Sequence, residues 1–240
     1  MSSFFNKSNT WPLSWVSHDA LSKLVGDLII EGTPETRTLN HKNIVDPFSA
    51  LFDMAISKMT YDEWENAEIR RQHQKTLQNA IGKFHQSVIG LVDGWEDLGV
   101  GAVVDVINKE KKIAAEIKNK FNTVKASDAI NIHSTLCGWR TMSVDHRDFT
   151  TYYVQILTKE RFNRPFTPPD HTRGVKPAPN EFVREIDGVS FYHLVTGDPM
   201  AMAKLYDVLP YILQEHCPSF DAEAATQHAL FSSLINKAMK

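Results

Sequence analysis

Two acidic side chains and one lysine stand within short apolar stretches near the middle of the chain. Asp105 lies in the run 103–107, and Glu116 and Lys118 lie in the run 113–118. Valine, isoleucine and alanine on either side of a polar break predict two strands joined by a tight turn. Charged residues in such strands call for a chemical explanation, because an unpaired buried charge is costly.

The register of this predicted hairpin decides whether the three charges share a face. Side chains alternate along a strand, so Glu116 and Lys118 project to the same side. A loop of two or four residues sets Asp105 opposite Glu116 or Ala114 and brings the charges together. A three-residue loop sets Asp105 opposite Ala115 and separates them.

Two neighbouring carboxylates in a partly buried site repel one another, and a divalent cation relieves that repulsion. Hard oxygen ligands of this kind suit Mg2+. A nearby ammonium group stabilises negative charge that develops in a transition state. This combination is suited to hydrolysis of a phosphodiester, in which the metal polarises the phosphoryl group and activates a water.

An aspartate on one strand followed by Glu-x-Lys on the next resembles the PD-(D/E)xK nuclease superfamily. The matching positions are Asp105, Glu116 and Lys118, with Val104 in place of the usual preceding proline. The resemblance implies a mixed α/β (α+β) fold, with a restriction-endonuclease-like central sheet flanked by helices and a helix-rich N-terminal third. It also implies that Asp105, Glu116 and the backbone carbonyl of Ile117 hold Mg2+, and that Lys118 orients or activates the attacking water.

The alternative is a surface hairpin whose charges are solvated. In that case the face that bears the charges should be polar throughout. It instead includes Val103, Ile107 and Ala114. Apolar residues on both faces indicate a strand pair covered on both sides, which favours the nuclease interpretation.

The segments around the hairpin sharpen the resemblance. The stretches 93–99, 116–123 and 152–168 look like those of type II restriction endonucleases, closest to the group that cuts GGNCC-type sites, and the similarity spans approximately residues 40–215. It implies hydrolysis of double-stranded DNA at a short palindrome to give 5'-phosphate ends. It further implies a homodimer within a restriction-modification system, whose cognate DNA methyltransferase protects the host.

Side chains that can reach phosphates and base edges follow the hairpin. Arginine and lysine can pair with guanine, and asparagine with adenine. The DNA-binding candidates are Asn119, Lys120, Asn122, Thr123, Lys125, Arg140, His146 and Arg147. Just before the hairpin, Glu96 and Asp97 are auxiliary candidates for the carboxylate site, with ordinary turn formation as the alternative.

Helices are predicted around the sheet. An amphipathic helix covers 17–30, Asp46 caps a second helix that ends near residue 59, and Thr60 opens a capping box for a long helix to about residue 92, with Gly82 as a candidate break. The later elements are a helix from 127, a strand at 150–158, a long loop at 164–179, a second hairpin of strands 182–186 and 189–195, and helices at 198–215 and 221–240.

Composition and charge limit the classes of protein to which the chain can belong. A hydrophobic fraction of 42% and an aromatic fraction of 10% exclude wholesale disorder. Residues 1–240 are expected to form a single restriction-endonuclease-like domain, with a mostly helical part at 1–92, the catalytic core and DNA-contact segments at 93–200, and C-terminal helices at 201–240. A net charge of -3 argues against DNA binding by bulk electrostatics but allows a local basic cleft.

No apolar run approaches the length needed to span a bilayer, and the N-terminus lacks a signal-peptide core. A protein of the bacterial cytoplasm, without membrane contact, is therefore expected. Cys137 and Cys217 lack metal-ligand spacing, which predicts free thiols. Two alternatives stay open: a repair or recombination nuclease of the same superfamily that recognises a DNA structure, and a non-catalytic DNA-binding protein that retains the fold.

Overall fold

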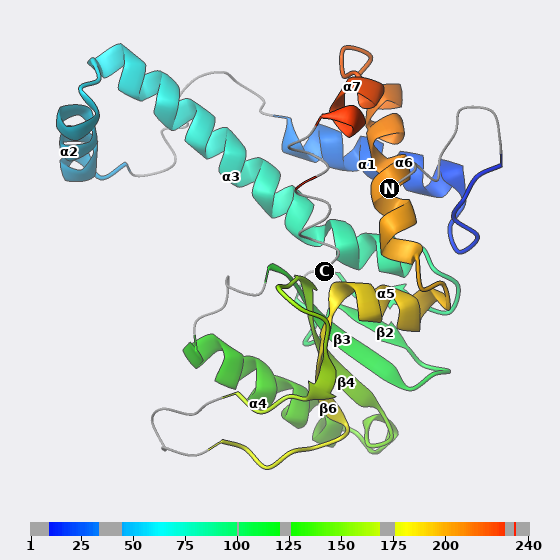
Figure 1. Cartoon of the computed structure of the whole chain (residues 1–240). Coiled ribbons are helices and arrows are strands. Elements are labelled where there is room, and N and C mark those ends of the chain that lie inside the picture. Colours follow the sequence, from blue (N-terminus) through cyan, green and yellow to red (C-terminus); the bar gives the residue numbers. More distant parts are fainter. Residues whose placement is uncertain are drawn as a thin grey trace. The chain divides into compact units, whose positions relative to one another are not determined.

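The strands form one six-stranded mixed sheet that is flanked by helices (Figure 1). The structure is a computed structural model that describes residues 10–33, 45–99, 101–120, 126–168, 176–228 and 233. The strands are β1 (Glu96–Asp97), β2 (Val106–Asn108), β3 (Ile113–Lys120), β4 (Thr150–Leu157), β5 (Asn163–Pro165) and β6 (Val183–Asp187), in the order β1-β2-β3-β4-β6-β5. The β3, β4 and β6 strands are parallel, and the other pairs are antiparallel. The predicted mixed α/β class is confirmed.

The helices are α1 (His18–Gly32), α2 (Pro47–Ser57), α3 (Tyr61–Gly90), α4 (Ala126–Met142), α5 (Gly188–Thr196), α6 (Ala201–His216) and α7 (Ala222–Gln227), with a 3-10 turn at Val144–His146. Contacts divide the chain into two compact units, one of Met1–Val25 and His85–Lys240 and one of Gly26–Phe84. The sheet belongs to the first unit. The second unit holds the end of α1, all of α2 and the greater part of α3, so the N-terminal third is helix-rich as predicted.

Local hydrogen bonds explain where the early helices begin. The Asp46 side chain accepts a hydrogen bond from the Phe48 backbone N–H at 3.0 Å, which caps α2. The Thr60 N–H donates to the Glu63 carboxylate at 2.8 Å, and the Glu63 N–H donates to the Thr60 hydroxyl at 3.3 Å. This is the predicted capping box. The helix that it opens continues through Gly82 without the break considered above.

Helices cover both faces of the sheet's centre. On one face, Leu136 and Trp139 of α4 join a buried cluster with Ala114, Tyr153 and Val183 from three neighbouring strands. On the other face α5 contacts β4, and its Phe191 ring lies 6.1 Å from the Tyr152 ring. The strands that carry the charged residues are therefore buried from both sides, as the apolar pattern predicted.

The first strand of the hairpin is shorter than predicted. β2 begins at Val106, residues 103–105 form a bend, and the side chain of Val103 is 40% exposed. The reason is local: the N–H of Ile117 donates to the Asp105 carboxylate at 2.6 Å, where a continued ladder would pair it with backbone. Val103 thus lies outside the covered face on which the sequence pattern placed it.

The predicted second hairpin is wrong in its second half. Residues 188–196 form α5 rather than a strand. The Asp187 carboxylate accepts a hydrogen bond from the Ser190 N–H at 2.9 Å and caps the helix. Gly188 packs so closely on β4 that an added Cβ would lie 2.5 Å from the Ile156 carbonyl oxygen. Asp-Gly therefore starts a buried helix here and does not make a tight turn between strands.

Smaller differences concern segment ends. The helix after the catalytic hairpin starts at Ala126 rather than at Ser127. The predicted loop 164–179 includes the end of β5, and its residues 169–175 lie outside the described part of the chain. The predicted last helix is described from Ala222 to Gln227. Within the described residues, no helix combines the length and apolarity needed to cross a bilayer.

Candidate active site

The register between β2 and β3 brings the three charged residues of the hairpin together. Asn108 pairs with Ile113, so the turn holds the four residues 109–112, and the pairs continue through Val106 opposite Ala115. Asp105 comes next, in the bend that precedes β2, and the Glu116 charge acts on its carboxylate. The predicted even loop length is confirmed, whereas the Asp105 carboxylate lies at the Ile117 N–H and is not among the residues that line the cavity with Glu116 and Lys118.

The Asp105 carboxylate lies at the β3 edge. Its Oδ2 accepts the hydrogen bond from the Ile117 N–H, and its own backbone N–H donates to the Ala115 carbonyl at 2.8 Å. Burial, and then the negative charge of Glu116, raises the pKa of Asp105 to about 6. Burial and the Glu116 charge therefore outweigh the opposing effects of the Lys118 charge and the Ile117 hydrogen bond.

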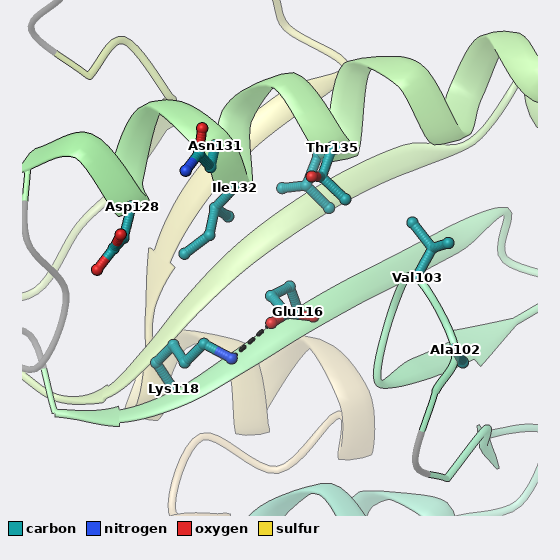
Figure 2. A pocket seen from close by; sticks show the side chains of 9 residues that line it. Ala102, Val103, Glu116, Lys118, Asp128, Asn131, Ile132 and Thr135 are labelled. Atoms are coloured by element: carbon teal, nitrogen blue, oxygen red, sulfur yellow. Dashed lines mark hydrogen bonds and ion pairs between the residues drawn. The ribbon is translucent and has the colours of Figure 1, made fainter.

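Glu116 and Lys118 project from β3 into a cavity and pair with each other. Lys118 Nζ lies 2.5 Å from Glu116 Oε1, as the dashed line in Figure 2 shows. The Glu116 side chain is 19% exposed and that of Lys118 is 38% exposed. Both charged ends can thus be reached from the solvent while their stems stay in the sheet.

This cavity has a volume of about 620 Å³ and lies between β3, α4 and the bend before β2. Its lining residues are Ala102, Val103, Glu116, Lys118, Asp128, Asn131, Ile132, Thr135 and Leu136. Figure 2 shows the α4 side chains across the cavity from Glu116 and Lys118. The space is large enough to admit a phosphodiester beside the hairpin charges.

Sequence reasoning missed the polar wall that α4 supplies. Asp128, Asn131 and Thr135 recur at i, i+3 and i+7, which places them on one side of the helix. They border the apolar stripe of Ile132 and Leu136 that packs on the sheet. This spacing was the available signal, but only the packing of α4 shows that the row faces Glu116.

The donor set fits a hard divalent cation. Asp105 and Glu116 supply carboxylate oxygens. Because the N–H and C=O of one residue in a strand point to the same side, the Ile117 carbonyl faces the same edge as the N–H that contacts Asp105. Among the described residues, no group of three or more His, Cys, Asp or Glu side chains is arranged to hold a metal. A cation here would thus rely on two carboxylates, a backbone carbonyl and water.

Comparison with known proteins identifies the family. Residues 13–218 match the family model of the Eco47II restriction endonuclease. The chain belongs to the Eco47II restriction endonuclease family. It is 42% identical over 177 residues to the type II restriction enzyme Eco47II of Escherichia coli, which covers 72% of this chain and 73% of that protein. It is also 32% identical over 202 residues to the type II restriction enzyme Sau96I of Staphylococcus aureus, covering 82% and 76%.

The predicted resemblance to type II restriction endonucleases is therefore confirmed, and the Eco47II-family chain is an enzyme of the nuclease class. Type II restriction endonucleases generally use divalent metal ions. This agrees with the oxygen-rich donor set at the β2–β3 hairpin.

The two auxiliary candidates of the Eco47II-family chain lie on β1 and contact other groups. Glu96 pairs with Lys109 Nζ at 2.9 Å. Asp97 accepts hydrogen bonds from Gln86 Nε2 at 2.6 Å and Ser87 Oγ at 3.0 Å, both from the last turns of α3. The charge of Asp97 adds a small upward contribution to the pKa of Asp105.

The predicted DNA-binding residues separate into groups. Asn119 and Lys120 continue β3 directly past Lys118. Asn122, Thr123 and Lys125 lie outside the described residues.

The other DNA-binding candidates lie near the start of β4, which pairs with the opposite end of β3. Arg140 donates to the backbone carbonyls of Phe149 and Arg147 at 2.8 and 2.6 Å. The His146 ring stacks on Trp139 with 3.9 Å between the centroids. Arg147 is exposed at this same end. The structure therefore does not bring Arg140, His146 and Arg147 to the cavity.

A second glutamate shares the sheet face of Glu116. Glu116, Tyr153 and Glu185 align across β3, β4 and β6. Burial, followed by the charges of Glu185 and Glu116, raises the pKa of Tyr153 to about 12. Glu185 is already paired with Arg164 Nε at 2.7 Å, so its charge is compensated without a metal.

Proposed function

We propose that this chain is a Mg2+-dependent type II endonuclease that hydrolyses double-stranded DNA at a short palindromic site, with Asp105, Glu116 and Lys118 as its catalytic residues. The observation that carries the proposal is the convergence of these three side chains at the β2–β3 hairpin beside an open cavity. Family membership supports the reaction class.

Asp105, Glu116 and the Ile117 carbonyl are the proposed holders of Mg2+. When bound, the ion would polarise the phosphoryl group and favour deprotonation of the attacking water. The negative charges of Asp105 and Glu116 would hold the ion at one side of β3. Because burial raises the pKa of Asp105, its ionised form is best matched by a cation held next to it.

Lys118 is the proposed residue that orients the water. Its ammonium group is anchored by Glu116 and partly exposed to the cavity, so it can donate a hydrogen bond to a water or to a phosphate oxygen. Water attacks the phosphorus in line, the 3'-oxygen leaves, and the product carries a 5'-phosphate. The ammonium stabilises the negative charge that develops.

The recognition site, the oligomeric state and the partner enzyme are proposed from the resemblance to type II restriction endonucleases. A palindromic site, GGNCC-like as the resemblance suggests, has two-fold symmetry, so one catalytic hairpin per chain implies a homodimer for cutting both strands. A cognate methyltransferase would protect the host in the bacterial cytoplasm. Asn119 and Lys120, the next residues of β3 after Lys118, are proposed to contact DNA.

The test is cleavage of unmethylated phage DNA with Mg2+. The Asp105→Ala and Lys118→Ala variants are compared with Glu110→Ala and Lys109→Ala, which remove exposed charges from the turn of the same hairpin. Discrete fragments are expected from the wild type and both turn variants. The two site variants should lose about 1,000-fold or more in rate, and EDTA should stop the reaction.

The other outcomes discriminate between functions. Smeared products that require Asp105 would favour a nuclease that recognises DNA structure. DNA binding without cutting would favour a non-catalytic protein. Cleavage that persists in both site variants would sink the assignment of this hairpin.

A further inference from the structure

Helix α2 presents an apolar stripe that no other described segment covers. None of its residues is buried. Phe48, Leu51, Phe52 and Ile56 are 73%, 62%, 68% and 78% exposed, respectively. Their spacing of i, i+3, i+4 and i+8 places them on one side of the helix, whereas Ser57 lies on the opposite side.

An isolated helix with this surface would be unstable in water. Eleven residues are too few for a stable helix without tertiary packing. The cap that Asp46 provides satisfies the first turn but covers none of the stripe. The four stripe side chains together present roughly 500 Å². That is at the upper end of the apolar patches found on monomeric proteins, where such patches often mark interaction sites.

The chemistry of the helix restricts what can cover the stripe. The sequence of α2 contains no lysine or arginine, and its one charged residue is Asp53. A helix that binds DNA needs basic residues, and a helix that lies on a membrane typically carries them on its polar face. The stripe itself is uncharged, so a second uncharged stripe is its best match.

We infer that α2 packs this stripe against the same stripe of a second copy of the chain. The contact would be isologous, because one surface serves both partners across a two-fold axis. Two stripes would bury roughly 1,000 Å², which is about the area that a specific interface needs. The inference rests on the proposed function in one respect: cutting both strands of a palindrome requires two copies of the hairpin site.

Sedimentation velocity of the full-length protein at low micromolar concentration tests the interface. Phe52→Glu and the double variant Phe48→Glu/Ile56→Glu place charge within the stripe. Ser57→Glu places the same charge on the opposite side and is the matched control, and Phe52→Leu keeps the stripe apolar. Because no other described segment packs on the stripe, the glutamate variants should lose at most the helical circular dichroism signal of the 11 residues of α2, while the rest of the chain still unfolds cooperatively.

A dimer is expected for the wild type, Ser57→Glu and Phe52→Leu, with a dimer dissociation constant raised at least about 100-fold in the two glutamate variants. A monomeric wild type, or glutamate variants that remain dimers, would overturn the interface. A wild-type monomer whose stripe variants lose affinity for DNA or for lipid vesicles would assign another occupant and overturn it equally.

Plasmid cleavage by the same samples separates this inference from the proposed function. A dimeric wild type that depends on the stripe but cuts no DNA would count against the endonuclease and leave the interface standing. A wild type that cuts both strands while its glutamate variants stay dimeric would count against the interface and leave the endonuclease standing. If both hold, the glutamate variants should nick one strand or cut slowly, because each chain keeps its own catalytic hairpin.

Discussion

At the residue scale, the site holds two carboxylates, those of Asp105 and Glu116, close enough to repel each other. Asp105 is partly buried beside Glu116, and burial and this neighbour raise its pKa to about 6. The ionised carboxylate therefore costs stability above that pH when no cation is bound. Such a cost is expected of a site shaped for a metal rather than for the stability of the chain alone.

Replacing Asp105 with Asn should separate activity from stability. We expect cleavage to fall about 1,000-fold or more, while the metal-free protein becomes more stable at pH 8 by about 1–2 kcal/mol, because the amide oxygen can still accept the Ile117 hydrogen bond without a charge. Since the folded-state pKa is raised, this gain should shrink as the pH falls from 6 towards 4. Urea unfolding at several pH values measures it, and a loss of stability at pH 8 would contradict the account.

A second buried group has the opposite pH dependence. His85 of α3 lies 2.8 Å from the hydroxyl of Tyr192 in α5, and burial lowers its pKa to about 4. Between about pH 6.5 and pH 4 the histidine is neutral in the folded chain and charged in the unfolded chain. Its contribution to stability is therefore lost as the pH falls from about 6.5 towards 4, at up to about 1.4 kcal/mol per pH unit.

His85→Gln should remove this acid sensitivity, because an amide can still hydrogen bond to Tyr192 but does not titrate. The free energy of unfolding of the variant, followed from pH 7 to pH 4, should fall less than that of the wild type. Parallel curves for the two proteins would mean that His85 does not titrate as the structure indicates.

At the element scale, α4 contributes more than packing. Its apolar side joins the core, and the neighbouring row of Asp128, Asn131 and Thr135 lines the cavity opposite Glu116. Because these side chains border the space where the phosphodiester is proposed to lie, the helix both supports the sheet and forms part of the substrate's surroundings.

Removing the polar groups of this wall should slow cleavage without unfolding the protein. Asn131→Ala and Thr135→Val are each expected to lower kcat/KM about 10- to 100-fold, as the loss of a hydrogen bond to a charged group would. Ser134→Ala, an exposed change on the same helix outside the cavity lining, is the control and should leave kcat/KM unchanged. Equal effects of all three changes in thermal unfolding and in activity would point to a general weakening of α4 instead.

At the scale of the whole molecule, metal binding and folding should be linked. The pair Asp105–Glu116 is assembled only when β2 and β3 are paired, so an ion that binds it favours the folded chain. Stability, catalysis and the response to pH would thereby be linked at the β2–β3 hairpin, in the interior of the strand order.

Adding Mg2+ should therefore raise the Tm of the wild type, by about 5 °C at concentrations far above the dissociation constant. The Asp105→Asn and Glu116→Gln variants should show almost none of this shift, and sodium chloride at matched ionic strength should not reproduce it. Differential scanning calorimetry decides, and an equal shift in all proteins would mean that Mg2+ binds elsewhere.

Features set by short-range chemistry could be predicted from the sequence alone. The Asp46 cap and the Thr60 capping box depend on residues a few positions apart, and the Asp105, Glu116 and Lys118 triplet depends on one hairpin with an even turn. Strand alternation and end-of-helix hydrogen bonds act locally, so the same local pattern gives the same local structure.

Tertiary structure decided what depended on partners distant in the sequence. Residues 188–196 form a helix because Gly188 packs closely on β4, and Arg140 and His146 lie away from the cavity because α4 crosses the sheet towards the start of β4. The polar wall of α4 faces Glu116 for the same reason. Which surface a helix buries, and which end of a parallel strand its side chains approach, follow from the packing of the whole sheet and not from any one stretch of sequence.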